Sequence, residues 1–83
     1  MVKIALITGA SAGIGRATAE LLLRNGYKVY AGARRVERMK GLEELGAKVL
    51  ALDITVDISV KNAVDTILEK EGRLDVLINN AGY

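Results

Sequence analysis

Residues 8–15 read Thr8-Gly9-Ala10-Ser11-Ala12-Gly13-Ile14-Gly15 and separate an apolar run from a helical pattern. Their glycines are spaced G-x-x-x-G-x-G. Because glycine lacks a side chain, another molecule can approach such a backbone closely, and the amides that open the following helix can bind an anion. The stretch predicts a phosphate-binding loop for a dinucleotide; the alternative is a tight strand-to-helix turn with no ligand. We expect these loop residues to contact the cofactor: Gly9, Ala10, Ser11, Gly13, Ile14 and Gly15.

Strand-like and helix-like patterns alternate along the rest of the chain. Apolar runs predict strands at 3–8, 28–33, 48–52 and 75–78, and helical spacing predicts helices at 14–25, 36–45 and from 55–59 to 71. Short connections between them indicate βαβ units and a parallel sheet. Right-handed crossovers give the strand order 3-2-1-4, with two helices on one face and one on the other. We therefore expect an α/β protein with a half Rossmann-like fold, in one domain over residues 1–83.

The spacing also indicates which side of each helix is apolar. The first helix has Ile14, Ala17, Leu21 and Leu22 on one side; the second has Val36, Met39, Leu42 and Leu45; the third has Val60, Val64, Ile67 and Leu68. The second set forms the apolar stripe of its helix, and we expect the third set to be the buried face of its helix. Tyr27 and Tyr30 are expected to pack near the second strand rather than bind a ligand.

The composition excludes several kinds of chemistry. The 83 residues contain no His and no Cys, which excludes disulfides, thiol nucleophiles, imidazole bases and the usual zinc sites. We therefore expect no metal, and the lack of Cys is compatible with the cytoplasmic location that we expect. A net charge of +2 is too small to indicate a nucleic-acid or membrane partner. The apolar run 4–7 is too short to span a membrane.

A basic cluster follows the second strand and bears on the choice of cofactor. An NAD-preferring site has a carboxylate at the end of this strand to bind the 2′-hydroxyl, whereas here Ala33 is followed by Arg34 and Arg35. A guanidinium can hold a 2′-phosphate with two parallel hydrogen bonds, and Ser11 could add a hydroxyl donor. The sequence thus predicts NADP rather than NAD, unless the arginines only solvate the start of the second helix.

Two further basic residues extend this cluster along the second helix, Arg38 and Lys40. Together with Arg34 and Arg35 they could suggest an RNA-binding patch. Stacking aromatic residues are not interleaved with them, although single-stranded nucleic acids are usually bound on such residues. A phosphate site beside a solvated helix face is therefore the favoured interpretation.

Three motifs in register give the chain a family resemblance. The glycine loop, Asp53-Ile54-Thr55 and Asn79-Asn80-Ala81-Gly82 resemble successive signatures of the short-chain dehydrogenase/reductase family, whose members have a Rossmann-like fold and bind NAD or NADP. The resemblance covers all 83 residues. It implies that the loop holds the pyrophosphate, that Asp53 and Ile54 border the adenine, and that Asn79 locks the fourth strand to its neighbours. The residues implied along the nicotinamide-side ribose are Asn80, Ala81 and Gly82.

The family's catalytic residues lie beyond the last of these motifs. They are an Asn, a Ser and a Tyr-x-x-x-Lys pair, and Tyr83 has no lysine four residues on. The resemblance therefore implies a truncated domain, excised or designed, that binds NADP and has no catalytic residues of its own. Two alternatives stay open: the N-terminal part of an NADP-dependent alcohol dehydrogenase or ketoreductase, and a folded, self-associating scaffold without measurable cofactor binding.

The fourth strand is expected to lie at an edge of the sheet. Residues 75–79 would then expose unpaired backbone groups beside an apolar face, which invites pairing with another chain. We expect a homodimer or higher oligomer through this strand.

Overall fold

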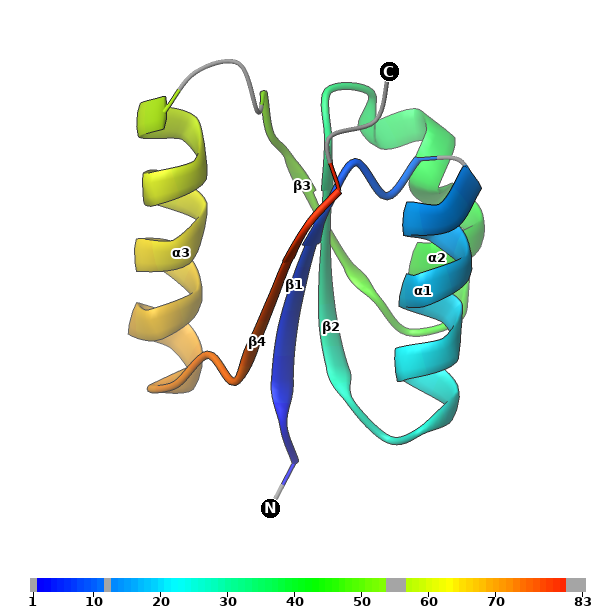
Figure 1. The fold of residues 1–83 in the computed structure, drawn as a ribbon, viewed down its shortest axis with the longest axis horizontal. Helices are drawn as coiled ribbons and strands as arrows, with labels where there is room; N and C mark the ends of the chain where they lie inside the picture. The colour runs from blue at the N-terminus through cyan, green and yellow to red at the C-terminus, as the bar shows by residue number, and fades with distance from the viewer. Residues whose placement is uncertain (1, 12, 54–56, 81–83) are drawn as a thin grey trace.

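The structure is a parallel sheet with helices on both faces (Figure 1). It is a computed structural model that describes residues 2–11, 13–53 and 57–80. The elements, in chain order, are β1 (Ile4–Thr8), α1 (Gly13–Arg24), β2 (Lys28–Ala33), the 3₁₀ helix η1 (Val36–Met39), α2 (Lys40–Glu44), β3 (Lys48–Ala51), α3 (Asp57–Glu71) and β4 (Val76–Asn79).

The topology matches the sequence prediction. The strand order is β3-β2-β1-β4, and each neighbouring pair is parallel. Helices α1 and α2 cover one face and α3 covers the other (Figure 1). The predicted half Rossmann-like architecture is thus confirmed. Every residue of β1 is buried, because β1 has a strand on each side and helices on both faces, and this explains its continuous apolar run.

The two faces of the sheet carry separate apolar cores. The core beneath α1 and α2 is built largely from small residues, including Ala19, Ala31 and Ala33. The core beneath α3 contains larger side chains, among them Leu6, Tyr30 and Ile67. Small residues let α1 approach the sheet closely, and this places the glycine loop directly over the ends of β1 and β2.

Helix α1 does not bury the side that the spacing marks as apolar. Ile14 and Leu21 are 79% and 60% exposed, and only Leu22 of that group packs on the core. The buried residues of α1 are Gly15 and Ala19. The apolar pattern correctly locates the helix, but the side that faces the sheet consists of Gly15 and Ala19 together with the partly buried Leu22 and Leu23.

The second predicted helix is shorter and less regular than its pattern suggests. It begins as the 3₁₀ turn η1, since Arg35 is extended and provides no side-chain cap, and such turns are common at helix starts. Met39 and Leu42 are buried as predicted. Leu45 lies beyond the end of α2 and is 57% exposed, so this member of the apolar stripe is not part of the core.

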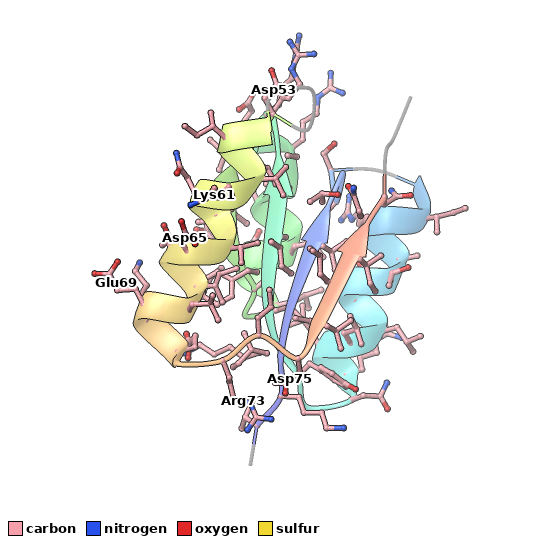
Figure 2. The ribbon with its side chains drawn as sticks, turned by 60° about the vertical axis from the view of Figure 1, so that its left-hand side comes forward. Asp53, Lys61, Asp65, Glu69, Arg73 and Asp75 are labelled. Carbon is pink, nitrogen blue, oxygen red and sulfur yellow. The ribbon has the colours of Figure 1, made fainter. Side chains whose placement is uncertain are left out.

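The third helix lies within its predicted bounds, and the fourth strand is shifted by one residue from its predicted range 75–78. Helix α3 buries Ile67 and Ala63, whereas Leu68, expected to be buried, is 43% exposed. Its outward side carries charged residues, with Lys61 Nζ 2.9 Å from Asp65 Oδ2 (Figure 2). Asp75 precedes β4 and exchanges backbone and side-chain hydrogen bonds with Ile4, which fixes the start of the β1–β4 pair.

Candidate functional site

The glycine loop forms the strand–turn–helix unit that its spacing predicts. It leaves β1 at Thr8, and α1 begins at Gly13. Gly9 and Gly13 have φ values of +65° and +62°, a backbone region that other residues adopt only with strain. Ala10 is buried, and its amide donates to the carbonyl oxygen of Gly32 at 3.2 Å. This bond holds the loop over the end of β2.

Asn80, which follows β4, packs against two of the three glycines. Its Nδ2 donates to the carbonyl oxygen of Gly9 at 3.2 Å. A Cβ atom on Gly9 would lie 2.1 Å from the backbone oxygen of Asn80, and one on Gly15 would lie 2.3 Å from the Gly9 oxygen and 2.6 Å from Asn80 Nδ2. Around Gly13, by contrast, a Cβ would meet nothing within 4 Å. Of the three loop glycines, only Gly13 would leave room for a Cβ, and its positive φ is what favours glycine there.

The neighbouring Asn79 ties β4 to β1. The hydroxyl of the buried Thr8 donates to Asn79 Oδ1 at 2.7 Å, and the two residues are partners in the parallel register. Asn79 thus locks the fourth strand to its neighbour, in line with what the family resemblance implies. Together, Asn79 and Asn80 connect the C-terminal end of β4 to the loop.

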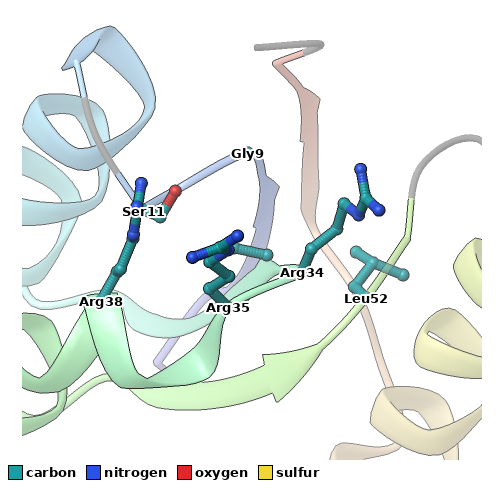
Figure 3. Close-up of a pocket in the computed structure, with 7 residues that line it drawn as sticks. Gly9, Ser11, Arg34, Arg35, Arg38 and Leu52 are labelled. Carbon is teal, nitrogen blue, oxygen red and sulfur yellow. The ribbon is translucent and has the colours of Figure 1, made fainter. Parts of the chain in front are cut away.

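A pocket of about 410 Å³ opens beside the loop, at the ends of β1 and β2 (Figure 3). Its described lining includes three arginines and no acidic side chain. The lining residues are Gly9, Ser11, Ala33, Arg34, Arg35, Arg38 and Leu52. The structure therefore brings together four residues that the sequence predicted for the site, the two loop residues Gly9 and Ser11 and the pair Arg34 and Arg35.

The three arginines approach the pocket from different directions (Figure 3). Arg38 extends toward Ser11, Arg35 lies between Arg38 and Arg34, and Arg34 projects on the side of Leu52. The Arg34 side chain is 74% exposed, and its Nε lies 3.9 Å from Asp53 Oδ2. Such a long, exposed ion pair contributes little energy, so Arg34 can turn toward an anionic ligand at small cost.

Arg38 and Leu52 are pocket residues that the sequence interpretation did not include in the site. Arg38 was assigned to a solvated helix face; it is exposed, but it also lines the pocket. The available signal was its spacing, because a residue three or four positions after Arg34 and Arg35 lies on the same side of a helical turn. Leu52 has no local signal, since it follows the end of β3 and is brought to the pocket by the sheet order.

The other described residues that were predicted for the site are not part of this lining: Ala10, Gly13, Ile14, Gly15, Asp53 and Asn80. The Ile14 side chain is exposed on α1. Asp53 lies just beyond β3, where its amide donates to the Ser59 hydroxyl oxygen at 3.1 Å. Three further predicted residues fall outside the described part of the chain: Ile54, Ala81 and Gly82.

Metal sites and membrane-spanning helices are both absent from the described residues. Over residues 2–11, 13–53 and 57–80, no group of three or more acidic side chains is placed to hold a metal ion. Within the same ranges, no helix is both long and apolar enough to cross a membrane.

The sheet order and the glycine loop at the ends of β1 and β2 define a Rossmann-like α/β protein. A family model for short chain dehydrogenases matches residues 3–83, and the chain belongs to that family. It is 47% identical over 81 residues to a 3-ketodihydrosphingosine reductase from Bacteroides thetaiotaomicron, an alignment that covers 96% of this chain and 28% of the relative.

Solved structures agree with this assignment. A metagenomic short-chain oxidoreductase in complex with NADP superimposes with a TM-score of 0.90 and 36% identity, over 98% of this chain and 39% of that one. A 3-ketoacyl-(acyl-carrier-protein) reductase from Brucella melitensis complexed with NADH has a TM-score of 0.87 and 38% identity, over 96% and 34%. The chain therefore spans about a third of the length of the relatives that it matches.

Proposed function

We propose that this chain binds NADP in the pocket beside the glycine loop, as the cofactor-binding part of a short-chain dehydrogenase/reductase. The observation that carries the proposal is the set of three arginines, from the end of β2 and from η1, around a pocket that no described acidic residue lines. A volume of about 410 Å³ lies within the range of small-molecule sites. Guanidinium groups are well suited to a phosphate, which they can hold with parallel charge-assisted hydrogen bonds.

The residues divide among the parts of the cofactor. In this proposal, the open backbone at Gly13 takes the pyrophosphate, and Ser11 with the three arginines takes the 2′-phosphate. Asp53 and Ile54 border the adenine, and Asn80, Ala81 and Gly82 lie along the nicotinamide-side ribose. The remaining predicted contacts are those of Gly9, Ala10, Ile14 and Gly15 in the loop.

Family membership alone does not decide between NADP and NAD. One relative is described with NADP and another with NADH. The local chemistry favours NADP, because Ala33 stands where an NAD-preferring site has a carboxylate and the arginines follow it. Bound NADPH would supply a hydride, while the residues named here bind and orient the cofactor.

The second candidate function is that of an oxidoreductase of which this chain is the N-terminal part. The reductase names of two similar proteins support it. Among the 83 residues, however, the family's Ser and Tyr-x-x-x-Lys pattern is not found, so we propose that this chain alone binds the cofactor without turning over a substrate. Reduction of any ketone by the purified 83-residue chain would support the second candidate and contradict the first. A cytoplasmic location and a homodimer formed through β4 remain part of the proposal.

The test compares NADP and NAD titrations, followed by calorimetry and by the backbone amide shift of Gly13. Arg38→Ala and Arg34→Ala each remove a cation from the pocket, and Arg24→Ala, on the exposed last turn of α1, is the matched control. A hydrogen bond to a charged group contributes about 1.5–3 kcal/mol, so each pocket variant should bind NADP about tenfold more weakly or worse. The affinity for NAD should change less than about twofold, and Arg24→Ala should leave both affinities unchanged.

Two results would count against the proposal. An NADP/NAD affinity ratio that is the same in Arg34→Ala, Arg38→Ala and the unmodified chain would show that the arginines only solvate the helix start. A Gly13 amide that does not move at millimolar NADP would instead favour the folded scaffold without cofactor binding.

A further inference from the structure

Gly32 is a buried glycine in the interior of β2, at a position where the backbone conformation does not require one. It is not among the glycines with positive φ, and it pairs in register with Thr8 of β1 and Leu50 of β3. A glycine weakens a strand interior and often marks a close approach of another group. Here that group is Leu52, because a Cβ on Gly32 would lie 2.5 Å from Leu52 Cδ2. Gly32 therefore makes room for Leu52.

Leu52 lies between the core of the protein and the cofactor pocket. It follows the last residue of β3, and its amide donates to the carbonyl oxygen of Ala33 at 2.9 Å, which holds it beside β2. Its side chain is 3% exposed and belongs to the core beneath α3, yet it also lines the pocket. The space that Gly32 leaves open thus decides where the Leu52 side chain stands in the pocket wall.

Gly32 is connected to the other side of the pocket as well. Its carbonyl oxygen accepts the hydrogen bond from the Ala10 amide at 3.2 Å, which holds the glycine loop over β2. The loop residue Ser11 and the Leu52 side chain lie on opposite sides of the pocket (Figure 3). Gly32 therefore contacts one side through its carbonyl group and the other through its Cα. An effect of substituting Gly32 must be assigned to one of these two contacts.

The wall formed by Leu52 differs chemically from the rest of the pocket. Leu52 is the one large apolar side chain in the described lining, and Arg34 stands beside it (Figure 3). In NADP, the 2′-phosphate and the adenine are carried by the same ribose. If the arginines hold the 2′-phosphate, the adenine lies within reach of them, and its burial against a leucine removes apolar surface from water. Asp53, which we assign to the adenine, is the next residue along the chain.

We propose that Gly32 is a positioning residue for the adenine, because the room that it leaves places Leu52 as the apolar wall against which the adenine ring packs. This inference rests on the proposed NADP binding and adds a residue that acts on the base rather than on the phosphate. Adenine is common to NADP and NAD, so a change at Gly32 alters both affinities by the same factor. A change at the arginines alters mainly the affinity for NADP.

A double-mutant cycle on the 83-residue chain tests this role. Gly32→Ala places a methyl group against Leu52 Cδ2, Leu52→Ala removes the wall, and the double variant measures the coupling between the two positions. Leu50→Ala is the matched control, because Leu50 packs against the same core but is not part of the described pocket lining. Calorimetry gives the NADP and NAD affinities, and urea unfolding shows that each variant is folded under the titration conditions.

We expect Gly32→Ala and Leu52→Ala each to bind both cofactors about fivefold more weakly, the effect of withdrawing about 40 Å² of apolar contact from the adenine. The NADP/NAD affinity ratio should stay unchanged in both variants. In the Leu52→Ala background, Gly32→Ala should weaken neither affinity further and should cost less stability, since the Cδ2 atom that it overlaps is gone. Leu50→Ala should lower stability but leave both affinities unchanged.

Other outcomes would overturn the inference. A folded Gly32→Ala that binds both cofactors as the unmodified chain does would show that the position of Leu52 does not matter. An equal loss of affinity from Gly32→Ala with and without Leu52 would show that Gly32 acts through the loop instead. A loss confined to NADP would place Leu52 at the phosphate rather than at the adenine.

Two further results keep the test decisive. If Gly32→Ala does not fold, Leu52→Ala and the double variant still carry the test, and the inference fails if Leu52→Ala binds both cofactors as tightly as the unmodified chain. Absence of NADP binding by the unmodified chain would refute the proposed function, and this inference with it. Binding that depends on the arginines but not on Leu52 would refute the role of Gly32 alone.

Discussion

Replacing Gly15 by Ala sets two opposing effects against each other. Gly15 lies in α1 with an ordinary helical φ, as it is not among the glycines with positive φ. In an exposed helix interior, Ala is more favourable than Gly by up to about 1 kcal/mol. Here, however, the new Cβ would lie 2.3 Å from the Gly9 carbonyl oxygen and 2.6 Å from Asn80 Nδ2.

The overlap should outweigh the gain in helix propensity. Ordinary van der Waals contact begins near 3.4 Å, so the loop or the helix would have to move by about 1 Å. The Gly9 oxygen is backbone and also accepts the Asn80 hydrogen bond, so it cannot swing away as a flexible side chain can. Overpacking of this kind costs about 1–3 kcal/mol. For a domain of this size, that corresponds to a loss of roughly 4–20 °C in melting temperature.

Gly41→Ala is the matched control for this substitution. Gly41 is also helical, and the atom nearest its added Cβ is a guanidinium nitrogen of Arg16, 2.8 Å away. That end of a flexible side chain can move, so the helix propensity should decide and Gly41→Ala should be neutral or slightly stabilising. Urea unfolding at low protein concentration, together with thermal melts, measures both variants. A Gly15→Ala protein as stable as the unmodified chain would refute the packing argument for Asn80.

Three further predictions concern the side of the molecule away from the cofactor pocket. Burial and the neighbouring Glu71 carboxylate raise the pKa of Tyr30 to about 12, above its ordinary value of about 10. The stabilisation linked to this pKa shift is complete below pH 10 and is lost as the pH rises from about 10 to 12. The free energy of unfolding of Tyr30→Phe, measured in urea, should therefore fall less over that range than that of the unmodified chain. Hydrogen bonds from Lys28 and Tyr30 lower the pKa of Glu71, so its contribution is present above its unfolded pKa of about 4.3 and is lost as the pH falls through the folded value. The free energy of unfolding of Glu71→Gln should therefore fall less between pH 6 and 3 than that of the unmodified chain. An equal fall in both proteins over this range would contradict the role of these hydrogen bonds. Ile67 is fully buried and Leu68 is 43% exposed, so Ile67→Ala should cost about 2–5 kcal/mol of unfolding free energy and Leu68→Ala less than about 1 kcal/mol; equal losses would refute the assignment of the buried side of α3.

The sequence was sufficient for the topology because that depends on local patterns. Apolar runs and helical spacing locate each element, and handedness rules then order the strands. The same patterns are less informative about which apolar residues face the core. Ile14, Leu21 and Leu45 belong to apolar sets on their helices yet are exposed, because a helical pattern indicates which side is apolar but not what covers it.

The site was predictable only where its residues are close in sequence. Ser11 lies within the glycine motif, and Arg34 and Arg35 directly follow a strand, so both parts could be related to a phosphate by local reasoning. Arg38 was placed on a solvated face because its distance from the loop could not be judged before the start of η1 was known. Leu52 could not be found at all, since it lines the pocket from the segment that follows β3, far along the chain from the glycine loop.

The contacts of Asn80 change what the glycine spacing itself shows. Gly9 and Asn80 are 71 positions apart, a separation that no local pattern reveals. Two of the three glycines have a reason to be glycine inside the chain, since Gly9 and Gly15 make room for Asn80 and for each other. Their spacing is therefore evidence for the fold, with or without a ligand. The argument for a cofactor depends instead on the arginines around the pocket, and these are the positions at which substitutions should change NADP affinity with little change in stability.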